Sequence, residues 1–117
     1  MQNSKSTPEN NLLMDEPSIE QALNRMELEM MTLRHIGVKK VKIVHGIGKV
    51  EDGNSIRSAV RAELLEEARA DKIQGFCPGE LFGPFENQGR EMVHMEPSFR
   101  DDQDWAKSND KITVVLL

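Results

Sequence analysis

The sequence predicts an α/β protein built as a two-layer sandwich, and three observations lead to this class. A helical pattern over 19–36 is followed by a strand-like segment at 38–45 and by a second helical pattern over 56–68. The chain closes with ITVVLL, residues 112–117, which is typical of a buried strand. Because the chain has 117 residues, we expect one domain around one hydrophobic core.

The first helix has clear start and stop signals. Ser18 and Gln21 have the spacing of a capping box, and Gly37 suits the left-handed residue that ends a helix near Ile36. Residues 1–11 are polar, so we expect a disordered N-terminal tail before this domain. One helix face collects the apolar side chains of Ile19, Ala22, Leu23, Met26, Met30 and Leu33.

The strand at 38–45 alternates between two kinds of side chain. Val41 and Ile43 point to one side, while Lys40 and Lys42 point to the other. A strand buried on both faces would not carry Lys42 at its centre. We therefore expect helices on one face of the sheet and solvent or a ligand on the other.

The second half of the chain contains a long connection. Ser55 or Asn54 caps the second helix, and residues 73–76 form a short strand. The segment 77–110 is rich in glycine, proline and acidic residues, and it is longer than ordinary loops. We expect it to be functional, disordered or partly structured, with a strand or hairpin arm at 92–95.

The net charge of −5 at first argues against a nucleic-acid partner, but the charge is unevenly distributed. Residues 1–33 carry −4, residues 34–61 carry +5 and residues 62–117 carry −6. Screening makes a bound anion respond mainly to the nearest charges. The basic centre is either a phosphate-binding patch or a solvated surface where lysines cluster.

The strongest local motif is HGIGK at 45–49, directly after a strand and shortly before a helix. Gly46 and Gly48 allow a tight turn and close approach of backbone amides to a ligand. The following helix N-terminus and Lys49 add positive charge, which is typical of an anion site. His45 can transfer a proton near neutral pH. An ordinary strand-to-helix turn is the alternative interpretation.

Several familiar sites are excluded by spacing. A dinucleotide fingerprint would need glycine where the chain has Glu51, and the upstream glycine of a Walker loop is missing. Cys77 is the single cysteine, which excludes an internal disulfide and a multi-cysteine zinc site and fits a cytoplasmic protein. No apolar run is long enough for a membrane helix, and no resident cofactor or metal is predicted with certainty.

Taken together, these segments resemble the Smr (small MutS-related) domain. The strand–HGxG–helix unit, the preceding helix and the final ITVVLL carry the resemblance over 12–76 and 111–117. It implies one domain over 12–117 with a βαβαββ-type mixed four-stranded sheet and two helices. It also implies binding of DNA or RNA, nicking or cleavage of these substrates, and a link to DNA repair or recombination.

The family's second motif, LDxH on the first strand, falls on Leu12 to Asp15 and is not preserved. Leu12 fits, but Leu13 stands at the aspartate position and Asp15 at the histidine position. In the nuclease hypothesis, His45 is the general acid or base and Asp15 is an acid, a base or the ligand of a divalent metal. Mg²⁺ and Mn²⁺ are the candidate metals in that case.

Three functions remain open from the sequence. The first is nucleic-acid binding through phosphates, and the second is the nuclease just described. In the third, the domain is catalytically silent and the acidic segment 77–110 binds a protein partner. That segment could also cover the basic surface. The proposed phosphate contacts are Gly46, Gly48, Lys49, Lys39, Lys40, Lys42, Arg57 and Arg61. The proposed protein anchors, which alternatively fill the segment's own core, are Phe82, Phe85, Phe99 and Trp105.

Overall fold

The computed structural model describes residues 7–47, 50 and 53–117 and contains a four-stranded mixed sheet. The strands lie in the order β1-β2-β4-β3. The β1–β2 pair is parallel, and β4 runs antiparallel to both of its neighbours. The strand bounds are β1 (Glu9–Asn11), β2 (Lys40–Val44), β3 (Gly75–Pro78) and β4 (Ile112–Leu116).

In the part of the chain that the structure describes, three α-helices and two short 3₁₀ segments accompany the sheet. The predicted α/β class with a mixed four-stranded sheet is confirmed, and the βαβαββ order holds with one additional helix inside 77–110. The segment 92–95 belongs to that helix, so the predicted strand or hairpin arm is wrong. The bounds are α1 (Ile19–His35), α2 (Ile56–Arg69), α3 (Asn87–Met95), η1 (Gly79–Leu81) and η2 (Pro97–Asp101).

The helix caps predicted from the sequence are present. The Ser18 hydroxyl accepts from the Gln21 amide at 3.1 Å, and the Gln21 side chain accepts from the Ser18 amide at 2.9 Å. Gly37 follows the C-cap with a φ of 84°, the left-handed conformation expected there. At the start of α2, the Ser55 hydroxyl accepts from the Ser58 amide. Among the described residues, no helix is long and apolar enough to cross a membrane.

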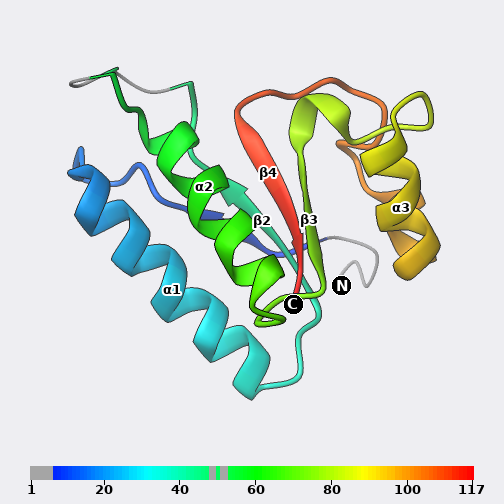
Figure 1. The fold of residues 1–117 in the computed structure, drawn as a ribbon, viewed down its shortest axis with the longest axis horizontal. Coiled ribbons are helices and arrows are strands. Elements are labelled where there is room, and N and C mark those ends of the chain that lie inside the picture. The colour runs from blue at the N-terminus through cyan, green and yellow to red at the C-terminus, as the bar shows by residue number, and fades with distance from the viewer. Residues whose placement is uncertain (1–6, 48–49, 51–52) are drawn as a thin grey trace, which may run out of the picture.

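Two apolar clusters lie on opposite faces of the sheet. Figure 1 shows α1 and α2 on one side of the strands and α3 on the other. Helices α1 and α2 pack on one face and complete the two-layer sandwich, with Met26, Met30 and Leu64 fully buried. Segment 77–110 covers the other face. Its aromatic rings Phe82, Phe99 and Trp105 form edge-to-face pairs with centroids 5.0–5.6 Å apart.

Lys42 lies under segment 77–110, so the expectation that this face of the sheet meets solvent or a ligand is wrong. Its side chain is 2% exposed, and its ammonium contacts Asp102 at 2.9 Å and Asp104 at 2.7 Å. Burial disfavours the charged ammonium, but the hydrogen bonds to both carboxylates outweigh it and raise the pKa of Lys42. The Lys42 ammonium and the Asp102 carboxylate are therefore buried together between β2 and the segment that covers it, with the partly exposed Asp104 beside them.

The N-terminal segment is ordered from residue 7, so the predicted tail through residue 11 is wrong over 7–11. Residues 9–11 form β1 against β2. The Thr7 hydroxyl donates to Asp102 at 2.5 Å, and the carbonyl of Pro8 accepts from the Lys42 amide. The polar sequence of this segment has no apolar alternation that would predict a strand. The edge strand forms nonetheless, because it is held mainly through its backbone.

The Lys42 cluster generates a stability prediction. Replacing Asp102 with alanine is expected to lower the free energy of unfolding by about 3–5 kcal/mol, since it leaves a buried ammonium with one carboxylate fewer. Urea unfolding monitored by circular dichroism measures the change.

The neighbouring Asp101 is exposed and supplies the control. Asp101→Ala should change stability by no more than about 0.5 kcal/mol. Similar losses for both variants would contradict a buried ion cluster centred on Lys42.

Candidate functional site

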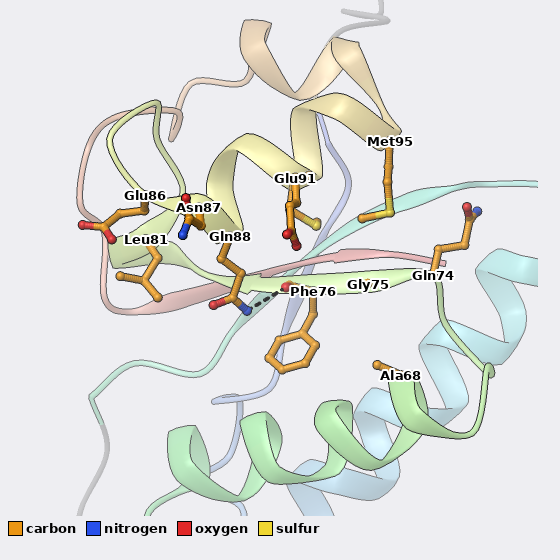
Figure 2. Close-up of a pocket in the computed structure, with 11 residues that line it drawn as sticks. Ala68, Gln74, Gly75, Phe76, Leu81, Glu86, Asn87, Gln88, Glu91 and Met95 are labelled. Atoms are coloured by element: carbon orange, nitrogen blue, oxygen red, sulfur yellow. Dashed lines mark hydrogen bonds between the residues drawn. The ribbon is translucent and has the colours of Figure 1, made fainter.

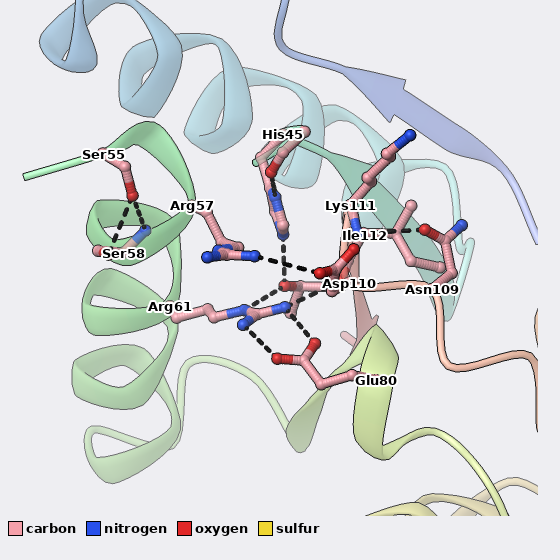
Figure 3. A network of polar contacts seen from close by, with 12 residues as sticks. His45, Ser55, Arg57, Ser58, Arg61, Glu80, Asn109, Asp110, Lys111 and Ile112 are labelled. Atoms are coloured by element: carbon pink, nitrogen blue, oxygen red, sulfur yellow. Dashed lines mark hydrogen bonds and ion pairs between the residues drawn. The ribbon is translucent and has the colours of Figure 1, made fainter. Parts of the chain in front are cut away.

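His45 lies directly after β2, at the edge of the sheet where α2 begins (Figure 3). Its amide and that of Gly46 both donate to the carbonyl of Lys111, at 3.1 and 3.0 Å. The imidazole is fully buried. The predicted position of His45 at a strand end is therefore correct, but its side chain has no open surface in this arrangement.

Both ring nitrogens of His45 have partners. Nδ1 lies 2.7 Å from the carbonyl oxygen of Gly46, which can only accept, so Nδ1 carries the proton. Nε2 then accepts from the hydroxyl of Thr113 in β4, at 2.8 Å. The Thr113 oxygen in turn accepts from Nε of Arg61 at 3.1 Å. The hydrogen bonds thus run in one direction, from Arg61 to Thr113, from Thr113 to the neutral imidazole and from the imidazole to Gly46.

Arg61 is held on its other side by Glu80 (Figure 3). Two guanidinium nitrogens donate to the two Glu80 oxygens at 2.8 and 2.7 Å, a bidentate pair. Burial alone would raise the pKa of Glu80, but the hydrogen bonds from Arg61 dominate and lower it. Glu80 comes from segment 77–110, so this acid neutralises a cation that the sequence assigned to phosphate binding.

The surroundings of His45 favour its neutral form. Burial, with the charges of Arg61 and Arg57, lowers its pKa to about 4 against the opposing hydrogen bond to Gly46. A general base needs a free lone pair that can reach the substrate. Here the lone pair of Nε2 is occupied, so the imidazole acts as a structural hydrogen-bonding group in this conformation.

The basic patch predicted over 34–61 is divided by the fold. Lys39 and Lys40 lie at the start of β2, the opposite end from His45. The Lys40 ammonium donates to Ser98 at 2.7 Å and lies 5.5 Å from the ring centroid of Phe99.

The remaining predicted cations differ in how far they are neutralised. Lys42 is buried with its two aspartates, and Arg61 is paired with Glu80. Arg57 makes a long, partly exposed ion pair of 3.7 Å with Asp110. All of these acids come from segment 77–110, which therefore does cover part of the basic centre, as the sequence suggested. Gly48 and Lys49 lie outside the described residues.

Asp15 does not complete a catalytic pair. It is exposed in the turn after β1 with a φ of 63°. Leu12 is buried, and its amide donates to the carbonyl of Val44. The two segments thus end at the same edge, but no contact joins the Asp15 carboxylate to His45 among the described residues. Asp15 and His45 also share no metal-ligating cluster in that part of the chain.

Sequence reasoning missed the partners that define this site. Thr113 is the one polar residue within ITVVLL, which is a usable signal for a buried hydrogen bond. Glu80 and Asp110 are indistinguishable from the other acids of segment 77–110 before the chain is folded. Lys111 immediately precedes β4 and is exposed beside Gly46.

A groove is present elsewhere, along the outer strand β3 (Figure 2). It runs between the end of α2 at Ala68 and the α3 residues Gln88 and Met95. The Gln88 amide donates to the carbonyl of Phe76 at 3.1 Å, which occupies an outward-facing acceptor of the strand. The groove does not include His45 or any residue predicted from the sequence as part of the site.

Comparisons of the chain with protein-family models, with curated protein sequences and with solved structures found no significant match. The Smr resemblance therefore stays a prediction from the HGxG motif and its flanking elements. The function has to be argued from the geometry of this chain alone.

The buried imidazole generates a prediction about pH. Its pKa of about 4 lies below the ordinary value of 6.5, so the folded state binds fewer protons than the unfolded state between these pH values. The stability that His45 contributes is present above pH 6.5 and is lost as the pH falls toward 4. This loss is roughly 3 kcal/mol.

Urea unfolding of the wild type and His45→Gln at pH 7.5, 5.5 and 4.5 isolates this contribution from those of the carboxylates. The stability advantage of the wild type over the variant should shrink steadily with falling pH. A difference that does not change with pH would contradict a buried neutral imidazole.

Proposed function

We propose that this protein binds the phosphate backbone of nucleic acid at the α2 edge, the surface formed by Gly46, Ile47, Arg57 and Lys111. The observation that carries the proposal is that Arg57, in the first turn of α2, and the exposed Lys111, which follows the Asp110 that pairs with Arg57, lie at the same edge of the fold (Figure 3). Positive side chains next to a helix N-terminus are a favourable environment for phosphate oxygens.

The first turn of α2 supports this assignment. The Ser55 hydroxyl accepts from the Ser58 amide, which caps one of the free donors of the helix. The amides of Ile56 and Arg57 have no acceptor among the described residues, as expected for the first positions of a helix. They are the backbone donors available to an anion, since the Gly46 amide already donates to Lys111.

The topology adds a second helix end at the same edge. Because β1 and β2 are parallel and each is followed by a helix, α1 and α2 both begin where these strands end (Figure 1). Each helix contributes about half a positive charge at its N-terminus. Glu20 in the first turn of α1 and Asp110 beside Arg57 oppose this field, so we expect weak binding that depends strongly on salt.

Binding without chemistry is the function that the arrangement supports better. A nuclease role for His45 would require the imidazole to leave its buried position and break its hydrogen bond to Thr113. Arg61 would also have to exchange Glu80 for a phosphate.

A second candidate function rests on Phe85. Three of the four proposed anchors of segment 77–110 pack inside it, but the Phe85 side chain is 90% exposed between η1 and α3. Covering an exposed phenylalanine with another protein surface is favourable, because it removes apolar area from water. The segment therefore offers one apolar anchor for a protein partner.

Salt-dependent binding tests the first proposal. Fluorescence anisotropy with labelled duplex DNA and duplex RNA should show binding at 25–50 mM salt, with log affinity falling against log salt at a slope of roughly −2 to −3 for DNA. Arg57→Ala and Lys111→Ala should each reduce the magnitude of this salt slope by about 1.

Lys72 is the matched control, because it is exposed beyond the other end of α2. Lys72→Ala should leave the slope unchanged. Absent binding at low salt, or an equal effect of all three variants, would count against phosphate binding at the α2 edge.

Partner capture tests the Phe85 candidate. Phe85→Ala is expected to reduce recovery of a protein bound by the wild-type chain by tenfold or more, as for an interface hot spot. Leu28→Ala removes another exposed apolar side chain, 62% exposed on α1, and should not reduce recovery. Equal recovery with all three chains would remove Phe85 as an anchor.

A further inference from the structure

Three carboxylates meet at the seam between α1 and α2, far from segment 77–110. Glu27 comes from α1, while Glu63 and Glu67 are four residues apart on one face of α2. One carboxylate oxygen from each residue lies within 4.8 Å of the other two. Like charges at this separation repel one another, so the cluster needs a group that compensates its charge.

Glu67 shows that this is not an ordinary solvated surface. It is only 6% exposed, although glutamate is rarely buried without a partner. Its Oε2 atom and the Oε1 atom of Glu27 are both buried, and neither has a hydrogen-bond donor among the described residues. A buried carboxylate oxygen that accepts no hydrogen bond is costly. Two such atoms in one cluster indicate a missing electropositive partner.

The charges around the cluster do not supply that partner. Arg34 of α1 is the cation whose charge acts on Glu67, but its Nη1 donates to the carbonyl of Lys72 at 2.5 Å. Among the described residues it forms no ion pair with the three glutamates. Glu67 also lies in the last turn of α2, where the helix dipole disfavours negative charge.

We propose that Glu27, Glu63 and Glu67 form a binding site for one hard divalent cation, of the class of Mg²⁺, Mn²⁺ and Ca²⁺. The site offers only carboxylate oxygens, which these ions prefer, and no imidazole or thiolate that would select zinc or copper. Opposite oxygens around such an ion, bound at about 2.1–2.4 Å, lie about 4.2–4.8 Å apart. The three ligand atoms lie no farther apart than this upper limit, so all three can reach one ion.

A shared proton is the competing explanation for the same contacts. Burial, the hydrogen bond that a protonated carboxyl would share with Glu27, and the charges of Glu27 and Glu63 together raise the pKa of Glu67 to about 8. A proton between two carboxylates would relieve part of the repulsion without any metal. The two explanations make different predictions at a pH high enough to remove the shared proton. A metal site then saturates with a divalent ion, whereas carboxylates that only share a proton do not.

The bound cation would clamp α1 to α2, since it takes ligands from both helices. The cluster is in the second half of α2, whereas Arg57 of the proposed phosphate surface is in its first turn. The inference is therefore independent of the proposed function.

The test is a metal titration of the full chain at pH 8.5, after treatment with EDTA and dialysis. Isothermal titration with MnCl₂ should show one ion per chain, and MgCl₂ or CaCl₂ should compete with it. The melting temperature should rise by roughly 10 °C when the ion exceeds its Kd a hundredfold. Bound Mn²⁺ should broaden the amide NMR signals around Glu27, Glu63 and Glu67 first.

Glu67→Gln and Glu27→Gln should each weaken Mn²⁺ binding at least tenfold. Both substitutions keep the side-chain shape and remove repulsion, so circular dichroism should show folded proteins. Glu66→Gln is the matched control: Glu66 is exposed on the same helix, and its variant should bind within twofold of the wild type.

Two results would overturn the proposal. One is that none of the three ions binds stoichiometrically at 5 mM. A Glu67→Gln variant more stable than the wild type would then identify a shared proton as the explanation. The other is unchanged Mn²⁺ binding in both Gln variants, which would place the ion elsewhere.

Discussion

The buried ammonium of Lys42 is the constraint on which much of the structure depends. A lysine in the middle of a central strand can be buried only if carboxylates accompany it, because a lone ammonium loses several kcal/mol of hydration. Asp102 and Asp104 supply these carboxylates from a segment 60 residues further along the chain. Asp102 also accepts from Thr7, and the backbone of Lys42 donates to Pro8. One charge thus specifies where both segment 77–110 and the N-terminal segment pack.

The other face of the same sheet has a similar arrangement around His45, in which an acid of segment 77–110 pairs with a cation. Thr113 of β4 links the imidazole to Arg61, and Glu80 of segment 77–110 completes the chain. The acids of that segment therefore neutralise cations on both faces. Two cations of the basic centre counted along the sequence, Lys42 and Arg61, are closely paired within the fold, and at the α2 edge Lys111 and the loosely paired Arg57 remain for a partner.

The predictable parts of the structure are those with local causes. Helix α1 was predicted with its caps because Ser18, Gln21 and Gly37 act within a few residues. Strand β1 was missed because the polar Glu9–Asn11 segment gains its conformation from the backbone of β2. The position of His45 followed from a local motif. Its burial did not, because it depends on Thr113, 68 residues away, and the acids that pair with the cations lie 19 to 62 residues from Arg61 and Lys42.

The two proposed ligands have opposite charge and lie toward opposite ends of the same helix pair. Helices α1 and α2 run parallel, because each returns from a strand of the same direction (Figure 1). Their dipoles therefore add, with positive ends near Ile19 and Ile56 and negative ends near His35 and Arg69. An anion at the first end and a cation near the second would each offset part of this field. Because the two sites share only the field and no side chain, occupancy of one should change affinity for the other modestly, and always in the favourable direction.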